Sequence, residues 1–237
     1  MTKKQLLPFI IVNIFFWIAT VTTDILYMKL GNPYIFKTLA SITFVLCAIS
    51  NCFIVLVNKS MIKDSFVYLM LAGQFFAMFG DILLIDNFML GAIFFAIGHI
   101  FYFFAFCSLK PFKLLDFAYI GITICVSVII ILLSGVKLGT QLPLILSYAL
   151  VISFMLGKSS TLFNFNKLTG FIIFVGSLFF YLSDMFLMFY LFGGENILFD
   201  NLCLIFYYPA QFILAMSIGA TVLINIHSTN KEKISDK

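Results

Sequence analysis

Long apolar stretches follow one another along almost the whole chain, and short segments with polar residues separate them. They lie at residues 8–28, 34–57, 65–85, 88–108, 114–133, 141–157, 168–191 and 199–225. A helix of about 20 apolar residues crosses the hydrocarbon core of a bilayer, so the pattern predicts eight spans. The runs are continuous and do not alternate, which favours helices over barrel strands. The predicted fold is an all-α polytopic membrane protein with eight transmembrane helices.

Composition agrees with this interpretation and narrows the protein class. The chain is 63% hydrophobic and only 10% charged, whereas soluble domains are about 25% charged, and the mean hydropathy is +1.14. We expect a single membrane domain over residues 1–237, because too few polar residues are left for a separate soluble domain. The net charge of +4 is small and dispersed, which argues against nucleic-acid binding.

The distribution of positive charge predicts the orientation in the membrane. All 14 cationic residues are lysines. Lys29 and Lys137 fall on one side of the predicted spans, and Lys37 falls inside the second span. The other side holds Lys3, Lys4, Lys59, Lys63, Lys110, Lys113, Lys158, Lys167, Lys231, Lys233 and Lys237. The positive-inside rule then places both termini in the cytoplasm. In a bacterial host the membrane would be the plasma or inner membrane.

Two similar stretches inside apolar runs carry the candidate chemistry. Gly73 precedes Asp81 by eight residues and Gly176 precedes Asp184 by eight, and a small residue stands directly before each Asp. A carboxyl group in hydrocarbon is costly, so two of them in matching settings predict a functional site. Their positions, four spans apart, also fit a parallel repeat of two four-helix halves.

The polar residues of the spans are predicted to share one layer. At about 1.5 Å per residue, Asp81 lies roughly 6 Å and Asp184 roughly 10 Å from the outer end of its helix. Residues of other spans fall in the same non-cytoplasmic half or near the middle: Lys37, His99, Tyr102, Tyr148, Tyr207, Tyr208 and Gln211. We therefore expect a cavity that opens toward the outer leaflet.

Both carboxyls have a chemical and a structural interpretation. They could form an ion pair, with Lys37 as partner, or carry out acid–base chemistry. Two carboxyls in a site of low dielectric constant are not expected both to ionise, because burial and like charge each disfavour the charged form. One would then donate a proton while the other serves as base, and Lys37 could keep the second one charged.

The surrounding residues have their own alternatives. We expect the small residues Gly73, Gly80, Gly176 and Ser183 to let the two Asp-bearing helices approach each other. Asp24 and Asp86 are expected at solvated helix ends. His99 fits a proton relay and a hydrogen-bonded packing residue equally well.

Several other site types are disfavoured. One histidine within the spans cannot supply a multi-histidine zinc site, and neither His-Glu-x-x-His nor Gly-x-Ser-x-Gly occurs in the chain. The five cysteines lie in apolar runs without a Cys-x-x-Cys pair and are expected to be small buried hydrophobic residues. No metal ion or organic cofactor is predicted.

Short motifs spread over spans two to eight resemble the YhhN family of eight-span membrane proteins, to which lysoplasmalogenases of the TMEM86 type belong. The matching stretches are Phe36-Lys37-Thr38-Leu39, Gly80-Asp81-Ile82-Leu83-Leu84, Gly91-Ala92-Ile93-Phe94-Phe95 with His99 and Tyr102, Ser183-Asp184, and Tyr207-Tyr208-Pro209-Ala210-Gln211. Thr38 departs from the family pattern, which usually has Pro after the Lys. This departure concerns local helix geometry and does not touch the acid pair.

The resemblance implies hydrolysis of the vinyl-ether bond of lysoplasmalogens to a fatty aldehyde and a glycerophospho-choline or -ethanolamine. It implies that Asp81 and Asp184 are the catalytic carboxyls. Six further residues are candidates for substrate binding: Lys37, His99, Tyr102, Tyr207, Tyr208 and Gln211. The expected partners are a lysophospholipid and the bilayer. Two other functions fit the residues: a proton-coupled transporter or lipid translocator that uses the Asp pair, and a structural membrane subunit.

Overall fold

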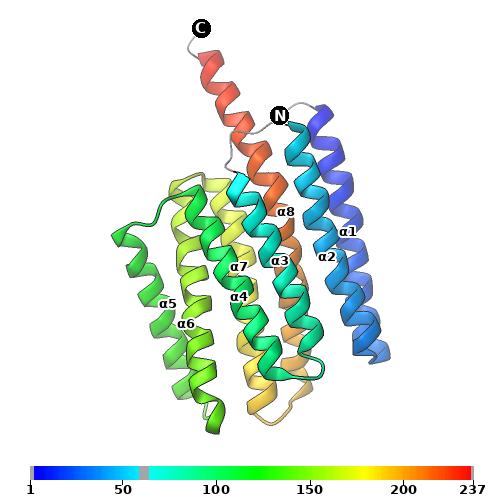
Figure 1. Cartoon of the computed structure of the whole chain (residues 1–237), viewed down its shortest axis with the longest axis vertical. Coiled ribbons are helices and arrows are strands. Elements are labelled where there is room, and N and C mark those ends of the chain that lie inside the picture. Colours follow the sequence, from blue (N-terminus) through cyan, green and yellow to red (C-terminus); the bar gives the residue numbers. More distant parts are fainter. Residues whose placement is uncertain (1–2, 59–63, 236–237) are drawn as a thin grey trace.

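The computed structural model describes residues 3–58 and 64–235, and all regular elements in them are helices (Figure 1). The long helices are α1 (Lys3–Leu30), α2 (Pro33–Asn58), α3 (Asp64–Leu83), α4 (Phe88–Leu109), α5 (Leu114–Leu133), α6 (Leu142–Ser160), α7 (Lys167–Phe192) and α8 (Ile197–Ser235). Short 3₁₀ turns flank α6, namely η1 (Gly139–Gln141) and η2 (Thr161–Asn164). The eight helices are long and apolar enough to cross a membrane, so the predicted spans are confirmed to within a few residues.

Polar residues and glycines set the helix ends. The Asn87 side chain accepts a hydrogen bond from the backbone N–H of Leu90, and Asn166 caps α7 in the same way, as N-cap residues do. Gly31 adopts a positive φ of 66° directly after α1, a conformation that glycine reaches without strain. At the other end of the chain α8 continues to Ser235, beyond the last predicted span, which ended at residue 225.

The helices form an upright bundle in which the chain runs alternately down and up (Figure 1). The two chain ends lie at the same end of the bundle, and α8 extends beyond its neighbours there. The span of α8 is the most buried, whereas α1 and α5 expose most of their apolar surface. Such an outward-facing apolar surface is typical of a multi-pass membrane protein.

The pairs of helices that pack together repeat in two halves. In the first half α1 packs on α2 and α3 on α4, and in the second half α5 packs on α6 and α7 on α8. Between the halves, α2 packs on α8 and α6 packs on α4. In each of these two contacts, the second helix of one half packs on the fourth helix of the other half. Two parallel four-helix halves related by a twofold axis would produce this pattern. The correspondence is incomplete, because α1 also packs on α8 without an equivalent contact of similar extent between α5 and α4.

Candidate functional site

Asp81 lies in α3 at the centre of a buried polar cluster. The Lys37 ammonium of α2 is 3.1 Å from Asp81 Oδ1. Asp81 Oδ2 accepts hydrogen bonds from the Ser41 hydroxyl at 2.5 Å and the Tyr208 hydroxyl at 3.0 Å. Only 3% of the Asp81 side chain is exposed. Both carboxyl oxygens of Asp81 therefore have buried polar partners.

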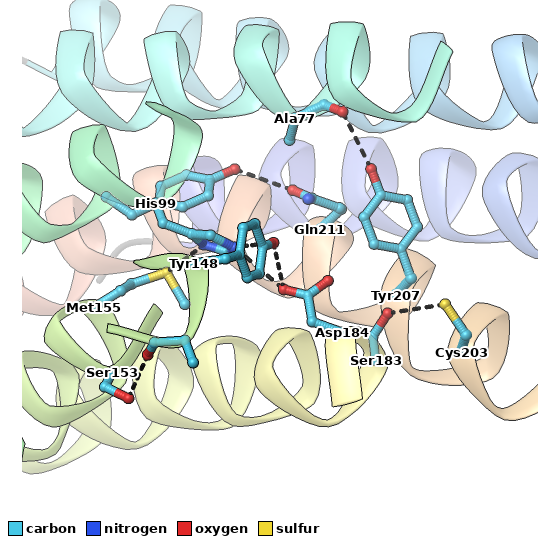
Figure 2. Close-up of polar contacts among 12 residues, drawn as sticks. Ala77, His99, Tyr148, Ser153, Met155, Ser183, Asp184, Cys203, Tyr207 and Gln211 are labelled. Carbon is cyan, nitrogen blue, oxygen red and sulfur yellow. Dashed lines mark hydrogen bonds and ion pairs between the residues drawn. The ribbon is translucent and has the colours of Figure 1, made fainter. Parts of the chain in front are cut away.

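Asp184 lies in α7 and has a different set of partners (Figure 2). The Tyr148 hydroxyl of α6 donates to Asp184 Oδ2 at 2.7 Å. The His99 ring of α4 places Nε2 at 2.8 Å from the Tyr148 oxygen and 3.3 Å from Asp184 Oδ2. Its other nitrogen, Nδ1, is 3.2 Å from the sulfur of Met155. Within the described residues no lysine pairs with this carboxyl group.

The two centres occupy equivalent places in the two halves. Asp81 of α3 takes its partners from α2 and α8, and Asp184 of α7 takes its partners from α6 and α4. The partners differ in chemistry, however, because a lysine stands beside one carboxyl and a tyrosine with a histidine beside the other. The two halves therefore hold two carboxyl groups in equivalent positions with chemically different partners.

Aromatic rings connect the two centres. The His99 ring packs on Phe180 with centroids 4.4 Å apart, and Phe180 packs on Tyr207 at 5.5 Å. Tyr207 in turn contacts the ring of Tyr208, the Asp81 partner, at 4.9 Å. The Tyr207 hydroxyl donates to the backbone carbonyl of Ala77 at 3.3 Å (Figure 2). The carboxyl groups thus lie on opposite sides of a packed aromatic layer.

A cleft between α4, α5, α6 and α7 reaches Asp184. The space free of protein atoms in and around it is about 730 Å³, which includes solvent at its open side. Four lining side chains carry polar atoms: Ser127, Tyr148, Tyr181 and Asp184. The other lining residues are Leu84, Phe88, Ala92, Phe95, Ile131, Leu144, Ile145, Ala149, Ile152, Met185, Leu187, Met188 and Phe192. An apolar cleft with a few convergent polar groups is the usual form of a small-molecule site.

The sequence matches the model of the YhhN family over residues 9–218, which is most of the chain. The chain belongs to the YhhN family. No curated protein and no solved structure matches it.

The residues predicted to bind substrate in this YhhN protein lie behind the cleft. Lys37 and Tyr208 contact Asp81, and His99 contacts Asp184. The Tyr102 hydroxyl donates to Gln211 Oε1 at 3.0 Å, and both side chains are fully buried. None of the six substrate-binding candidates is among the residues that line the cleft. The predicted polar layer therefore consists of separate hydrogen-bonded networks, of which one faces the cleft.

Tyr148 is the site residue that sequence analysis placed in the polar layer without giving it a role. It lines the cleft and bonds to both Asp184 and His99. Ser41 was not identified at all, although it follows Lys37 by one helical turn and shares its carboxylate partner. Serine is common in apolar helices, so its presence in the second span did not indicate a contact with another span.

The glycines pack tightly, but not between the helices that were predicted. A Cβ atom at Gly80 would lie 2.9 Å from the Phe95 ring of α4, and one at Gly176 would lie 3.0 Å from Leu214 of α8. They bring α3 close to α4 and α7 close to α8, and the two Asp-bearing helices are not a closely packed pair. The prediction that these residues let α3 and α7 approach is therefore wrong, because neighbouring helices use the small positions.

Asp24 was expected at a solvated helix end, and this prediction is also wrong. Only 7% of the residue is exposed, and its buried Oδ1 atom has no hydrogen-bond partner among the described residues. It lies within electrostatic range of Asp81 and Asp200. Asp86, by contrast, is exposed as predicted and accepts a hydrogen bond from Tyr34 at 2.6 Å.

Lys158 was counted as a loop lysine, but it lies in α6 and is fully buried. Its ammonium is 2.6 Å from Asp116 Oδ2 and 5.5 Å from the centre of the Phe112 ring. Asp116 also accepts a hydrogen bond from the backbone N–H of Lys113 at the start of α5. This ion pair ties α6 to the first turn of α5 and adds no free charge to that side of the bundle.

All five cysteines are free, and Cys125 is exposed on α5 rather than buried as expected. Within residues 3–58 and 64–235, no group of three or more His, Cys, Asp and Glu side chains is placed to hold a metal ion.

Proposed function

We propose that this YhhN protein is a membrane lipid hydrolase that cleaves the vinyl-ether bond of lysoplasmalogens. The products would be a fatty aldehyde and a glycerophospho-choline or -ethanolamine. One observation carries the proposal: Asp184, which is hydrogen-bonded to Tyr148, is one of the few polar residues that line an otherwise apolar cleft. A lipid presents this combination, because its hydrocarbon chain prefers the apolar walls and its reacting bond carries the polar atoms.

The chemistry needs an acid and a means of stabilising positive charge. Protonation of the vinyl ether at carbon gives an oxocarbenium ion, and water then adds to the carbon that bears the oxygen. A carboxylate near such a cation lowers its energy, as in glycosidases. In the proposal Asp81 and Asp184 are the two carboxyls that the reaction requires, and Lys37 is the ion-pair partner of Asp81.

The location of the cleft fits a substrate that enters from the bilayer. Phe88, Leu144 and Phe192 line it at the helix ends remote from the chain termini. If the termini are cytoplasmic, as the lysines predict, these ends face the outer leaflet. A single-chain lipid of that leaflet would then place its chain along the apolar walls and its ether bond beside Asp184.

The test is release of fatty aldehyde from a lysoplasmalogen by the purified protein in detergent. We expect activity in the wild type and a loss of about 10² to 10⁴-fold in Asp184→Asn and in Asp81→Asn, the range of general acid–base catalysis. Asp86→Asn removes an exposed carboxyl and serves as the control with unchanged activity. If the wild type releases no aldehyde, or if both buried substitutions leave the release unchanged, the proposed reaction is wrong.

A proton-coupled transporter is the second candidate. It is favoured by the similar packing of helices in the two halves, in which α2 packs on α8 and α6 packs on α4. Transporters are often built from such repeats, with their binding sites at the junction of the halves. The two functions differ in outcome, since a transporter would move lipid or protons across proteoliposomes without forming aldehyde.

A further inference from the structure

We infer that the paired hydroxyl groups of Ser127 and Tyr181 bind a free hydroxyl group of the lipid in the cleft. In the proposed substrate this is the hydroxyl on the middle carbon of glycerol, next to the carbon that carries the ether oxygen. Ser127 and Tyr181 are then specificity-determining residues. The identity of the lipid rests on the proposed function, but the test of the hydroxyl contact needs no turnover.

Ser127 and Tyr181 form a second polar point of the cleft, near Asp184. Ser127 lies on α5 and Tyr181 on α7, both line the cleft, and their oxygens are 2.7 Å apart. Only 5% of each residue is exposed. Tyr181 precedes Asp184 by three residues, so the two side chains are neighbours on one face of α7. A ligand beside Asp184 is therefore also within one helical turn of Tyr181.

The hydroxyl hydrogens of this group are used within the protein. Ser153 donates to the backbone carbonyl of Ala149 at 2.6 Å, and Ser127 donates to that of Thr123 at 2.8 Å. Each hydroxyl has one hydrogen, so the 2.7 Å contact between Ser127 and Tyr181 takes the hydrogen of Tyr181. The contact between Ser127 and Ser153, at 3.4 Å the longest of the four, receives none. The Tyr181 oxygen therefore keeps only lone pairs for a ligand.

Tyr148, the third hydroxyl group that lines the cleft, has also used its hydrogen. It donates to Asp184 Oδ2 at 2.7 Å. The fully buried His99 ring places Nε2 at 2.8 Å from the Tyr148 oxygen and 3.3 Å from Asp184 Oδ2. Asp184 Oδ1 makes no hydrogen bond with the described residues and is left for the reacting bond. In the described part of the chain, no hydroxyl that lines the cleft donates into it.

A group that offers only lone pairs binds a hydrogen-bond donor. A free alcohol supplies a hydrogen to the Tyr181 oxygen, whereas an ester or ether oxygen at the same place would bring two acceptors together. A site that bonds to a ligand hydroxyl disfavours analogues that lack it, because its own polar group is then left unpaired. In glycerol the hydroxyl and the ether oxygen are on adjacent carbons. With the hydroxyl at Tyr181, the ether bond therefore lies toward Asp184.

Binding of saturated ether lipids tests the inference, because they lack the vinyl bond that the proposed reaction cleaves. One probe is an alkyl ether lysophosphocholine with the free hydroxyl. The second is its deoxy analogue, in which hydrogen replaces that hydroxyl, and the third is its methyl ether. We expect the hydroxyl lipid to bind the wild type in detergent about 3- to 10-fold more tightly than either analogue, the range of one neutral hydrogen bond. Titration calorimetry measures the three Kd values.

Two substitutions separate hydrogen bonding from packing. Tyr181→Phe removes the acceptor and should bring the hydroxyl and deoxy lipids to within about twofold of each other. Ser127→Ala releases the Tyr181 hydrogen, which can then point into the cleft, so the methyl ether should gain about threefold or more over the deoxy analogue. Tyr119→Phe, at an exposed position of α5, and Ser147→Ala, whose hydroxyl bonds within α6, are matched controls that should keep the wild-type preference.

Three results would overturn the inference: equal affinity of the wild type for the hydroxyl and deoxy lipids, binding of none of the three probes, or a full hydroxyl preference in Tyr181→Phe. Each would leave the hydrolase proposal to be decided by aldehyde release. The opposite failure is distinct. If the preference follows the expected pattern and the wild type releases no aldehyde from a lysoplasmalogen, the reaction is wrong and Ser127 with Tyr181 binds the hydroxyl of a lipid that the protein does not cleave.

Discussion

The Tyr102 hydroxyl of α4 donates a hydrogen bond to Gln211 Oε1 of α8 at 3.0 Å. Tyr102 follows His99 by three residues, and Gln211 follows Tyr208 by three residues. His99 contacts one candidate carboxyl and Tyr208 contacts the other. The bond therefore joins equivalent turns of the two halves, each about one helical turn from a residue that contacts a carboxyl group.

Removing the Tyr102 hydroxyl should weaken this junction. Tyr102→Phe leaves Gln211 Oε1 buried without a donor, and we expect a loss of about 0.5–2 kcal/mol in the free energy of unfolding, as for other hydrogen bonds between membrane helices. Unfolding in mixed detergent micelles measures it, with Tyr119→Phe as the control. A change no larger than that of the control would show that the bond contributes nothing to the packing of the halves.

Gly80 and Gly121 form a matched pair for testing helix packing. A methyl group at Gly80 would lie 2.9 Å from the Phe95 ring, whereas one at Gly121 would meet nothing within 4 Å. We expect Gly80→Ala to cost about 1–3 kcal/mol of stability through overpacking. Gly121→Ala should be stabilising by about 0.5–1 kcal/mol, because alanine favours the helix. Equal effects on the melting temperature of the two variants would contradict the close packing of α3 on α4.

The buried pair of Lys158 and Asp116 predicts a strong effect on stability away from the cleft. Lys158→Met leaves the Asp116 charge buried alone and should cost about 3–5 kcal/mol, whereas Lys158→Met with Asp116→Leu should recover most of that loss. Thermal unfolding of the single and double variants measures the difference. If the double variant is as unstable as the single one, the pair is not held together mainly by its charges.

Orientation in the membrane can be tested with one cysteine at a time. In a chain without its native cysteines, we expect a membrane-impermeant maleimide to label Lys137→Cys in intact cells and to label Lys110→Cys only after the cells are opened. The physical reason is the excess of lysines on the side that holds the termini. The reverse labelling pattern would show that the protein has the opposite orientation in the membrane, with the cleft facing the cytoplasmic leaflet.

The spans were predictable from the sequence because lipid leaves the backbone no alternative. A polar group of the backbone in hydrocarbon must bond within its own helix, so twenty apolar residues in a row already determine a spanning helix. The same argument marked Asp81 and Asp184, since a carboxyl in such a run is costly wherever the helix packs. Local residues set the helix ends in the structure, as Asn87 and Gly31 illustrate.

The environment of each carboxyl could only come from the tertiary structure. Lys37 and Tyr148 were both visible as polar residues of the outer half, but the partner of each depends on which helices pack together. Asp24 shows the same limit, because its position near a helix end predicted solvent while the packing of α1 buries it. A membrane sequence is apolar on nearly every face of its helices, so it carries little information about which face meets which neighbour. Sequence alone thus determined the eight helices and the two carboxyls, and tertiary packing decided that one faces a cleft and the other a lysine.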